Sequence, residues 1–350
     1  MIHPDAAIGR HPPGPREQAS GPRRSADRRG EPRREAEPRP IPHDPLSPTV
    51  FHEGWWLDIA SEGRWREARV ERDGRLVARL PFMPARNRLG MGLLLPPSLC
   101  HVLGPAFAGD VPADGGARSL RRFTLTAELI AQLPPAAHTW FRLHRGIGDT
   151  IAFGGAGFAT VTDFTTEIAP APEADLWRAM RDKTRNVIRR AEQRLILTDR
   201  IDPAEFLIFY EENLRRQGRR NHRCPAMLRD LIAAAVERRS GRLLVAHDDR
   251  GELAAGIFTA WNGTQEHYLL STRGPRAGNG GIALLLWDAI RAAARAGRRF
   301  DTDGLRSGQN HLLLTGLGGV IVPRLLVERG TLAYRALQLG INALGGMRRR

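Results

Sequence analysis

Residues 265–304 read QEHYLLSTRGPRAGNGGIALLLWDAIRAAARAGRRFDTDG, and this stretch decides the predicted fold. Residues 265–271 carry tyrosine, leucine and alternating polar residues, a pattern typical of a β-strand. Residues 272–281 follow as a loop with four glycines, one proline and two arginines. Apolar residues then recur at helical spacing over 282–296, and Gly297 ends the helix before a new strand at 298–303.

A strand, a glycine-rich turn and a helix in this order predict an anion-binding site. The first N–H groups of a helix lack intrahelical partners and lie at the positive end of its dipole. Gly278, Gly280 and Gly281 would let a phosphate approach the backbone, and Arg273 and Arg276 would add charge-assisted hydrogen bonds. The alternative is an ordinary glycine-rich connection between a strand and a helix.

This stretch resembles the acyl-CoA site of the GNAT acetyltransferase superfamily, in which an (Arg/Gln)-x-x-Gly-x-(Gly/Ala) loop holds the CoA pyrophosphate. In RAGNGG, residues 276–281, the arginine stands one position too close for a strict match. The longer pattern resembles the second domain of the FemAB-like, BioF2-like acetyltransferases. The resemblance implies an α/β (α+β) tandem GNAT fold, with mixed, mostly antiparallel sheets flanked by helices. It also implies an acyl-CoA site that includes Ser271 and Asn310.

Composition divides the chain into four predicted parts. Residues 1–46 have almost no large apolar side chains, so we expect a disordered tail, with a mis-assigned start codon as a related explanation. Residues 47–169 include a hairpin signal at Asp73-Gly74 and resemble the family's first, degenerate GNAT-like domain. Prolines at 170 and 172 predict a junction to the BioF2-like domain at 170–335, which is followed by a basic helix or tail at 336–350.

The net charge of +15 suggests acidic partners, but 52 of the 53 basic residues are arginine, and Lys183 is the one lysine. Such usage is explained more simply by GC-rich coding than by selection for phosphate contacts. An arginine-rich nucleic-acid-binding protein is the non-enzymatic alternative, although the sequence shows no nucleic-acid-binding motif. Two distant cysteines and the lack of an apolar leader favour a cytoplasmic protein, with at most peripheral contact to the inner face of a membrane.

Residues 174–194 predict one amphipathic helix with a strongly basic outer face. The sequence RDKTRNVIRRAEQ within it resembles the basic helix that opens the second domain of Fem and BioF2-like proteins. We interpret Arg185 and Arg189 as part of an electropositive wall for an anionic substrate, and a solvated arginine face is the alternative. The D-G-x-R stretch of the family adds Arg306 to the predicted substrate-binding residues.

Acyl transfer to an amine requires a proton acceptor for the amine and a proton donor for the leaving thiolate. His267 is a natural base, and Tyr268 could supply the thiolate proton. Asp301 and Asp303 share one face of the next strand, where burial of unpaired carboxylates would be costly, so either could take or orient the amine. The alternative for His267 and Tyr268 is ordinary packing in the sheet.

These observations predict an N-acyltransferase, most simply an N-acetyltransferase, that uses acetyl-CoA or another acyl-CoA without a metal. The family relationship implies an amine acceptor on a cell-envelope or exopolysaccharide precursor. A Fem-type enzyme that uses aminoacyl-tRNA is the alternative, but Leu314 stands where Fem relatives carry a lysine. His222 and Cys224 could suggest a metal, but no second pair has zinc-like spacing.

Overall fold

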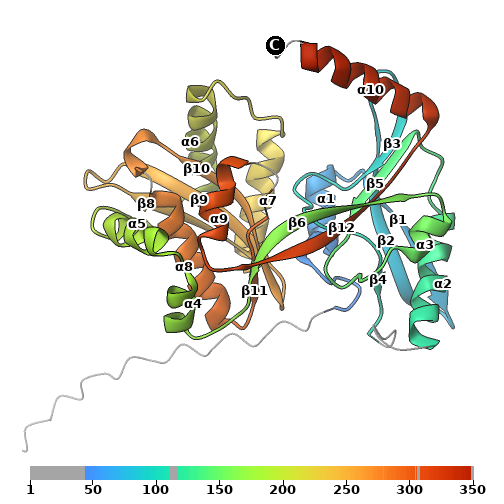
Figure 1. Cartoon of the computed structure of the whole chain (residues 1–350), viewed down its shortest axis with the longest axis horizontal. Coiled ribbons are helices and arrows are strands. Elements are labelled where there is room, and N and C mark those ends of the chain that lie inside the picture. Colours follow the sequence, from blue (N-terminus) through green and yellow to red (C-terminus); the bar gives the residue numbers. More distant parts are fainter. Residues whose placement is uncertain (1–43, 110–116, 279, 304, 306–307, 348–350) are drawn as a thin grey trace, which may run out of the picture. The chain divides into compact units, whose positions relative to one another are not determined.

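A computed structural model describes residues 44–109, 117–278, 280–303, 305 and 308–347 (Figure 1). Ile41–Arg350 forms one compact unit. The tail predicted at 1–46 lies outside the described residues as far as residue 43. Among the helices of the described part, none is long and apolar enough to cross a membrane.

Among the described residues before the predicted junction, two short helices precede four strands, and from there on helices and strands alternate. In chain order they are η1 (Val50–His52), α1 (Gly54–Ser61), β1 (Arg66–Arg72), β2 (Arg75–Arg86), β3 (Gly92–Leu95), β4 (Ala106–Phe107), α2 (Ala117–Ala131), β5 (His138–Arg142), α3 (Ile151–Gly155) and β6 (Ala159–Ile168). The predicted hairpin is present, because β1 and β2 pair antiparallel around Asp73 and Gly74. Both turn residues have positive φ, 51° and 73°, as a tight hairpin turn requires.

After the predicted junction, four helices and one short strand precede a three-stranded meander, and a long helix and further strands follow it. They are α4 (Glu173–Ala179), α5 (Asp182–Glu192), β7 (Ile196–Thr198), α6 (Pro203–Arg216), α7 (Pro225–Glu237), β8 (Gly241–His247), β9 (Leu253–Trp261), β10 (Gln265–Arg273), η2 (Pro275–Ala277), α8 (Gly281–Arg295), β11 (Arg299–Asp301), α9 (Gly308–Thr315), β12 (Val320–Gly330) and α10 (Leu332–Met347). Proline occupies the first turn of both α6 and α7, where its missing N–H costs no helical hydrogen bond.

The single helix predicted over 174–194 is wrong, because the chain breaks between α4 and α5. Met180 and Arg181 are extended, with ψ of 149° and 142°. The break packs against a glycine turn, where the Arg181 N–H donates to the Gly316 carbonyl at 3.1 Å. A Cβ at Gly318 would lie 2.8 Å from the carbonyl carbon of Ala179. The end of α4 can therefore pack against this turn only because residue 318 is glycine.

Within the described residues the strands form one mixed sheet in the order β1-β2-β3-β5-β12-β6-β11-β10-β9-β8-β7, with β4 paired to β2. Most neighbouring pairs are antiparallel, and β3–β5 and β10–β11 are parallel. The predicted mixed α/β fold class is therefore confirmed. β12 lies between β5 and β6, so the last strand pairs with two strands of the first half (Figure 1). The predicted domain division at 170 stays a prediction.

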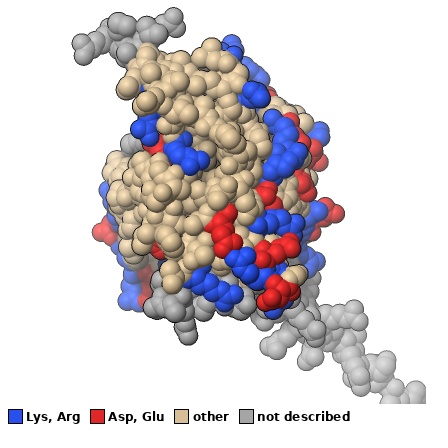
Figure 2. All heavy atoms as spheres, turned by 90° about the vertical axis from the view of Figure 1, so that its right-hand side faces the viewer, with Lys and Arg blue, Asp and Glu red and all other residues tan. Residues whose placement is uncertain are grey.

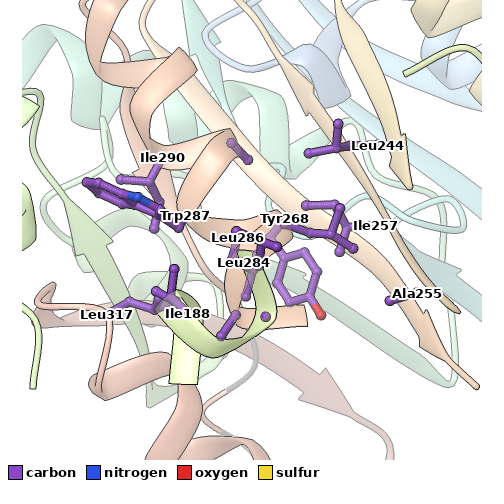
Figure 3. Close-up of a cluster of buried hydrophobic side chains, with 14 of the residues drawn as sticks. Ile188, Leu244, Ala255, Ile257, Tyr268, Leu284, Leu286, Trp287, Ile290 and Leu317 are labelled. Atoms are coloured by element: carbon purple, nitrogen blue, oxygen red, sulfur yellow. The ribbon is translucent and has the colours of Figure 1, made fainter. Parts of the chain in front are cut away.

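Three apolar clusters fill the space between the sheet and its helices. One lies on α8, where Leu284, Leu286 and Trp287 pack with Ile257 of β9 and Ile188 of α5 (Figure 3). A second cluster joins η1 and α1 to α6, α7 and the meander. The third lies under β1, β2 and α2. The first cluster fixes α8 against the meander and so positions the glycine loop that precedes it.

Candidate functional site

β10 and β11 separate at the point where the sequence predicts chemistry. The two parallel strands pair only from Gln265 opposite Arg299 to His267 opposite Asp301. β10 then continues along β9 to Arg273, with a register shift between Tyr268 and Leu270. The chain after β11 turns to β6, where the Thr302 N–H donates to the Thr166 carbonyl at 3.0 Å. The strands therefore diverge directly after His267 and Asp301.

The glycine loop connects the far end of β10 to the start of α8. The Gly274 N–H donates to the Ala254 carbonyl at 2.8 Å, which holds the beginning of the loop on β9. Gly278 has φ of 59° and ψ of −160°, a conformation that is open essentially to glycine alone. α8 is 15 residues long and begins directly after Gly280. Its first N–H groups therefore present a partial positive charge at the end of the loop.

Two of the three predicted cofactor-binding glycines also serve close packing. A Cβ at Gly280 would lie 2.7 Å from the Val187 carbonyl oxygen and 2.8 Å from the Ala191 Cβ. A Cβ at Gly281 would lie 3.0 Å from the Ala277 Cβ. Both glycines thus have a structural reason that involves no ligand, because α5 and η2 approach the start of α8 at this point.

The two predicted phosphate-binding arginines lie in different environments. Arg273 is exposed and donates to the Gly278 carbonyl at 3.4 Å, so its side chain follows the loop. Arg276 instead forms ion pairs with Asp248, at 3.0 Å, and with Glu252 in the turn between β8 and β9. Two carboxylates already compensate its charge. We therefore revise the prediction for Arg276, which anchors the loop to this turn.

Arg194 and Arg216 are cations beside the loop that the motif did not identify. A Cβ at Gly278 would lie 3.3 Å from Nη2 of Arg194, so this guanidinium covers the loop from the end of α5. Arg216 and Arg273 line an open hollow together with Gly274 and Gly278. The signal for Arg194 was its place on the basic helix, but its proximity to the loop depends on how α5 packs.

Asp301 lies at the centre of a buried network and is 1% exposed. Its carboxylate accepts hydrogen bonds from Thr165 Oγ1 at 2.6 Å, Gln265 Nε2 at 3.2 Å and Arg324 Nη2 at 2.5 Å. Burial alone would raise the pKa of Asp301, but the Arg324 guanidinium and the neighbouring His267 outweigh it and hold the pKa well below its ordinary value. Such a carboxylate is a poor base and does not reach solvent, so we revise its predicted role from base to positioning group.

Asp303 lies two residues beyond the divergence and is more accessible, with 22% of its side chain exposed. Arg324 Nη1 donates to Asp303 Oδ1 at 2.6 Å, and His101 Nδ1 lies 2.8 Å from Asp303 Oδ2. Burial opposes ionisation, but His101 and Arg324 hold the pKa of Asp303 far below its ordinary value. The backbone of Asp303 is strained, with φ of 27°. The carboxylate is thus built to orient a histidine.

His101 is a candidate base that sequence reasoning missed, because no local motif around it points to Asp303. It follows β3 in the chain, far from Asp303 in sequence, and 14% of its side chain is exposed. With Nδ1 directed at the Asp303 carboxylate, Nε2 is left as the proton-accepting nitrogen of the neutral ring. The resulting histidine–carboxylate pair lies just beyond the strand divergence.

His267 and Tyr268 are buried beside this network. The His267 ring is 1% exposed, lies 4.7 Å from the Phe51 ring centroid, and has Nδ1 3.5 Å from Asp301 Oδ2. Tyr268 lies with Leu284 and Leu286 in the cluster of Figure 3, and burial raises its pKa to about 12. These positions fit the packing alternative for both residues. Their catalytic roles stay predictions.

The two arginines of α5 predicted to bind substrate lie in different environments. Arg185 Nη1 donates to the carbonyls of Trp177, at 3.3 Å, and of Met180, at 2.9 Å, so it caps the end of α4 and is not free for a substrate. Arg189 is exposed, with its guanidinium 5.3 Å from the Trp177 ring centroid.

Three further predictions concern the surroundings of the site. Ser271 lies on β10 and is half-buried. Arg306 and the Asn310 side chain lie outside the described residues. Among the residues that the structure describes, no group of three His, Cys, Asp or Glu side chains could hold a metal, and the metal-free prediction stays a prediction.

Comparisons with known proteins identify the fold that carries this geometry. Residues 178–309, which include α5, the glycine loop and α8, match the family model described as Acetyltransferase (GNAT) domain. The crystal structure of FemX superposes with a TM-score of 0.59 at 11% identity, over 82% of this chain and 93% of that chain. The C-terminal domain of a putative lysylphosphatidylglycerol synthetase from Agrobacterium fabrum gives 0.52 at 13% identity, over 81% and 89%. The search of curated proteins returned no match.

Proposed function

We propose that this chain, which has a FemAB-like GNAT fold with an acetyltransferase domain, transfers an acyl group from acyl-CoA to a primary amine. The observation that carries the proposal is the divergence of β10 and β11 directly before a glycine loop and the start of α8. In this arrangement two parallel strands part from one another, and the strand β10 leads on to a positively polarised helix end. A thioester with a phosphate-bearing tail fits both features.

The residues around the loop fit a polyanionic donor. Arg273 and Arg216 line the hollow beside Gly274, and Arg194 covers Gly278 from α5. These cations, together with the first N–H groups of α8, would bind the phosphates of CoA by charge-assisted hydrogen bonds. When bound, CoA would supply an activated thioester carbonyl.

We assign the base to His101, oriented by Asp303. In the reaction the amine nitrogen forms a bond to the carbonyl carbon and the carbon–sulfur bond breaks, so CoA leaves as a thiolate. The amine loses one proton, which His101 Nε2 accepts, and the thiolate gains one from the solvent or a nearby donor. Asp303 stabilises the protonated imidazole because its carboxylate lies 2.8 Å from Nδ1.

The acceptor is proposed from the family relationship to be an amino group on a cell-envelope or exopolysaccharide precursor, in the cytoplasm. The first half of the chain would shape the acceptor cleft, since it supplies His101. An aminoacyl-tRNA donor is the alternative. Leu314 stands where Fem relatives carry a lysine and is buried in the cluster around α8. The absence of that lysine, together with the glycine loop, favours CoA.

Calorimetry with the full chain tests the donor. We expect CoA and acetyl-CoA to bind with dissociation constants in the micromolar to sub-millimolar range, and adenosine alone to bind far more weakly because it lacks the phosphates. Aminoacyl-tRNA serves as the competing ligand. Binding of aminoacyl-tRNA with no heat from any CoA species would contradict the proposal.

A further inference from the structure

The last helix presents an apolar face that nothing in the described part of the chain covers. α10 is 16 residues long, and Arg335 is its one charged residue. Leu332 is 84% exposed and Leu339 is 71% exposed. These residues are seven apart and Ala336 lies between them, so all three fall on one side of the helix.

The opposite side of α10 faces the protein. Tyr334 stacks on His138 with ring centroids 4.5 Å apart, and Gln338 Nε2 donates to the Tyr334 hydroxyl at 3.2 Å. Tyr334, Leu337 and Gln338 are half-buried. Leu332, Ala336 and Leu339 therefore point away from the protein, although α10 has another side that packs against it. Burial of an apolar face against the body is the usual arrangement, so this orientation indicates an external partner.

The β2–β3 hairpin lies near the start of α10 and also combines an exposed leucine with exposed arginines. The tip of the β2–β3 hairpin carries exposed Arg86, Arg88 and Leu89, and Leu89 is 67% exposed. The hairpin and α10 are connected through β5. The Ala137 N–H donates to the Gly92 carbonyl at 2.8 Å, and the Thr331 N–H donates to the Ala137 carbonyl at 2.9 Å. The strand β3 and the start of α10 therefore lie at neighbouring positions.

Exposed cations border these leucines. Arg335 is the one charged residue of α10 and its side chain is exposed. Arg86 and Arg88 add two cations on the hairpin. Figure 2 shows that the upper part of the face that includes the α10 side is mostly uncharged with basic residues at its borders, while acidic and basic residues mix lower down. Exposed leucines bordered by arginines complement a bilayer surface with anionic headgroups.

We propose that α10 and the β2–β3 hairpin tip form a docking surface for an anionic lipid bilayer. Leu332, Leu339 and Leu89 enter the boundary between headgroups and acyl chains, and Arg86, Arg88 and Arg335 contact lipid phosphates. The helix lies in the plane of the interface. This inference does not depend on the acyl donor, because it uses no residue of the candidate site.

Co-sedimentation with lipid vesicles tests the proposal on the full chain. We expect binding to phosphatidylcholine vesicles with 30% phosphatidylglycerol and weak binding to pure phosphatidylcholine vesicles. The pair Arg86→Gln/Arg88→Gln should weaken partitioning on the order of tenfold or more, the usual contribution of two surface arginines. The double substitution Leu332→Gln/Leu339→Gln should weaken it by a similar factor, because it removes the apolar area that enters the bilayer. The substituted side chains are exposed, so the melting temperature should not change.

Matched controls come from other exposed positions. Ile208→Gln on α6 removes an apolar side chain of similar exposure, 63%, and Arg219→Gln/Arg220→Gln removes two exposed arginines. Both should bind like the unsubstituted chain. The proposal is wrong if the chain does not sediment with anionic vesicles, or if the controls lose as much binding as the test variants. It is equally wrong if light scattering shows a dimer that Leu332→Gln/Leu339→Gln dissociates, since the face would then bind a second copy.

Discussion

At the scale of single residues, Asp301 and Asp303 are two positions apart but face different surroundings. Asp301 is enclosed by Thr165, Gln265 and Arg324, whereas Asp303 joins Arg324 to His101 at a partly open position. The alternation of a strand predicts a shared face for them but not this difference. The structure therefore separates a buried anchor from a carboxylate that can assist a base.

His101→Gln and Asp303→Asn should lower kcat by roughly 10²–10⁴-fold, the usual contribution of a positioned base, with little change in CoA affinity. Steady-state kinetics with an identified amine acceptor measures this. For Asp303→Asn the loss should shrink at high pH, where more acceptor amine is already deprotonated. Unchanged turnover in both variants would exclude the pair and leave His267 to be tested.

Gly280→Ala should destabilise the protein by about 1–3 kcal/mol, because the added Cβ meets the Val187 carbonyl oxygen at 2.7 Å and α5 must shift. Urea unfolding monitored by circular dichroism measures the change. Gly154→Ala is the matched control, since a Cβ there meets nothing within 4 Å and the residue is helical. Equal stability of the two variants would show that α5 does not pack tightly on the loop.

At the scale of elements, the glycine loop is held from two sides, by α5 and by the turn between β8 and β9. Arg194 belongs to the first contact and Arg276 to the second. Arg194→Gln should weaken CoA binding about tenfold or more, the usual effect of losing one hydrogen bond between charged groups. Arg276→Gln should change the affinity much less, because its charge is already compensated by Asp248 and Glu252. Calorimetry with CoA measures both affinities. A larger loss for Arg276→Gln than for Arg194→Gln would support the original prediction that Arg276 binds the phosphates.

His52 of η1 packs against His144, which follows β5, and the ring centroids of these two buried histidines are 5.2 Å apart. Burial lowers the pKa of His144 to about 4, and burial, with the neighbouring charges, also lowers the pKa of His52. Nε2 of each ring lies within hydrogen-bonding distance of a carbonyl, at 3.2 Å from Gly104 for His52 and 2.8 Å from Pro105 for His144. The folded state therefore keeps both rings neutral.

This pair should make the protein acid-sensitive below the ordinary histidine pKa of 6.5. The unfolded chain takes up protons there while the folded chain does not, so the free energy of unfolding falls as pH decreases from about 6.5 towards 4. The slope should be roughly 1.4 kcal/mol per pH unit for each ring. Urea unfolding at several pH values measures it. In His144→Gln the slope should decrease by roughly 1.4 kcal/mol per pH unit, the contribution of one ring. An unchanged slope would mean that the His144 ring is already charged in the folded state.

At the scale of the whole molecule, Arg324 connects parts of the chain that are distant in sequence. It lies on β12 and binds Asp301 at the end of β11 as well as Asp303, while Thr165 of β6 and Gln265 of β10 bind the same Asp301 carboxylate. The network thus fixes four strands at the strand divergence. It holds the geometry of the candidate site in place.

Arg324→Met should cost about 3–5 kcal/mol at pH 7, because two buried carboxylates lose their cation. Arg64→Met, which breaks an exposed ion pair with Glu62, should cost at most about 1 kcal/mol. The folded pKa values of Asp301 and Asp303 lie below the ordinary 3.8, so their stabilising contribution is complete above about pH 4 and is lost as pH falls below it. Chemical unfolding at pH 7 and pH 3 should show the difference between the variant and the unsubstituted chain shrinking in acid. A difference that stays constant would contradict the charge network.

The amino-acid sequence alone determined the features that depend on neighbouring residues. Asp73-Gly74 set the hairpin because its turn needs positive φ at two successive positions. The strand, glycine loop and helix of residues 265–296 could be predicted because apolar spacing and glycine content are local signals. The mixed fold class followed from the order of such elements.

Only the tertiary structure decided which distant groups meet. The ion pairs of Arg276, the contact of His101 with Asp303 and the place of β12 between β5 and β6 each join segments that the local pattern treats separately. The break between α4 and α5 has the same cause, because its helical spacing continues through Met180 while the packing on Gly318 does not allow a continuous helix. Local patterns report the preference of a segment for a conformation, and a site is made where the packing of the whole chain brings several segments together.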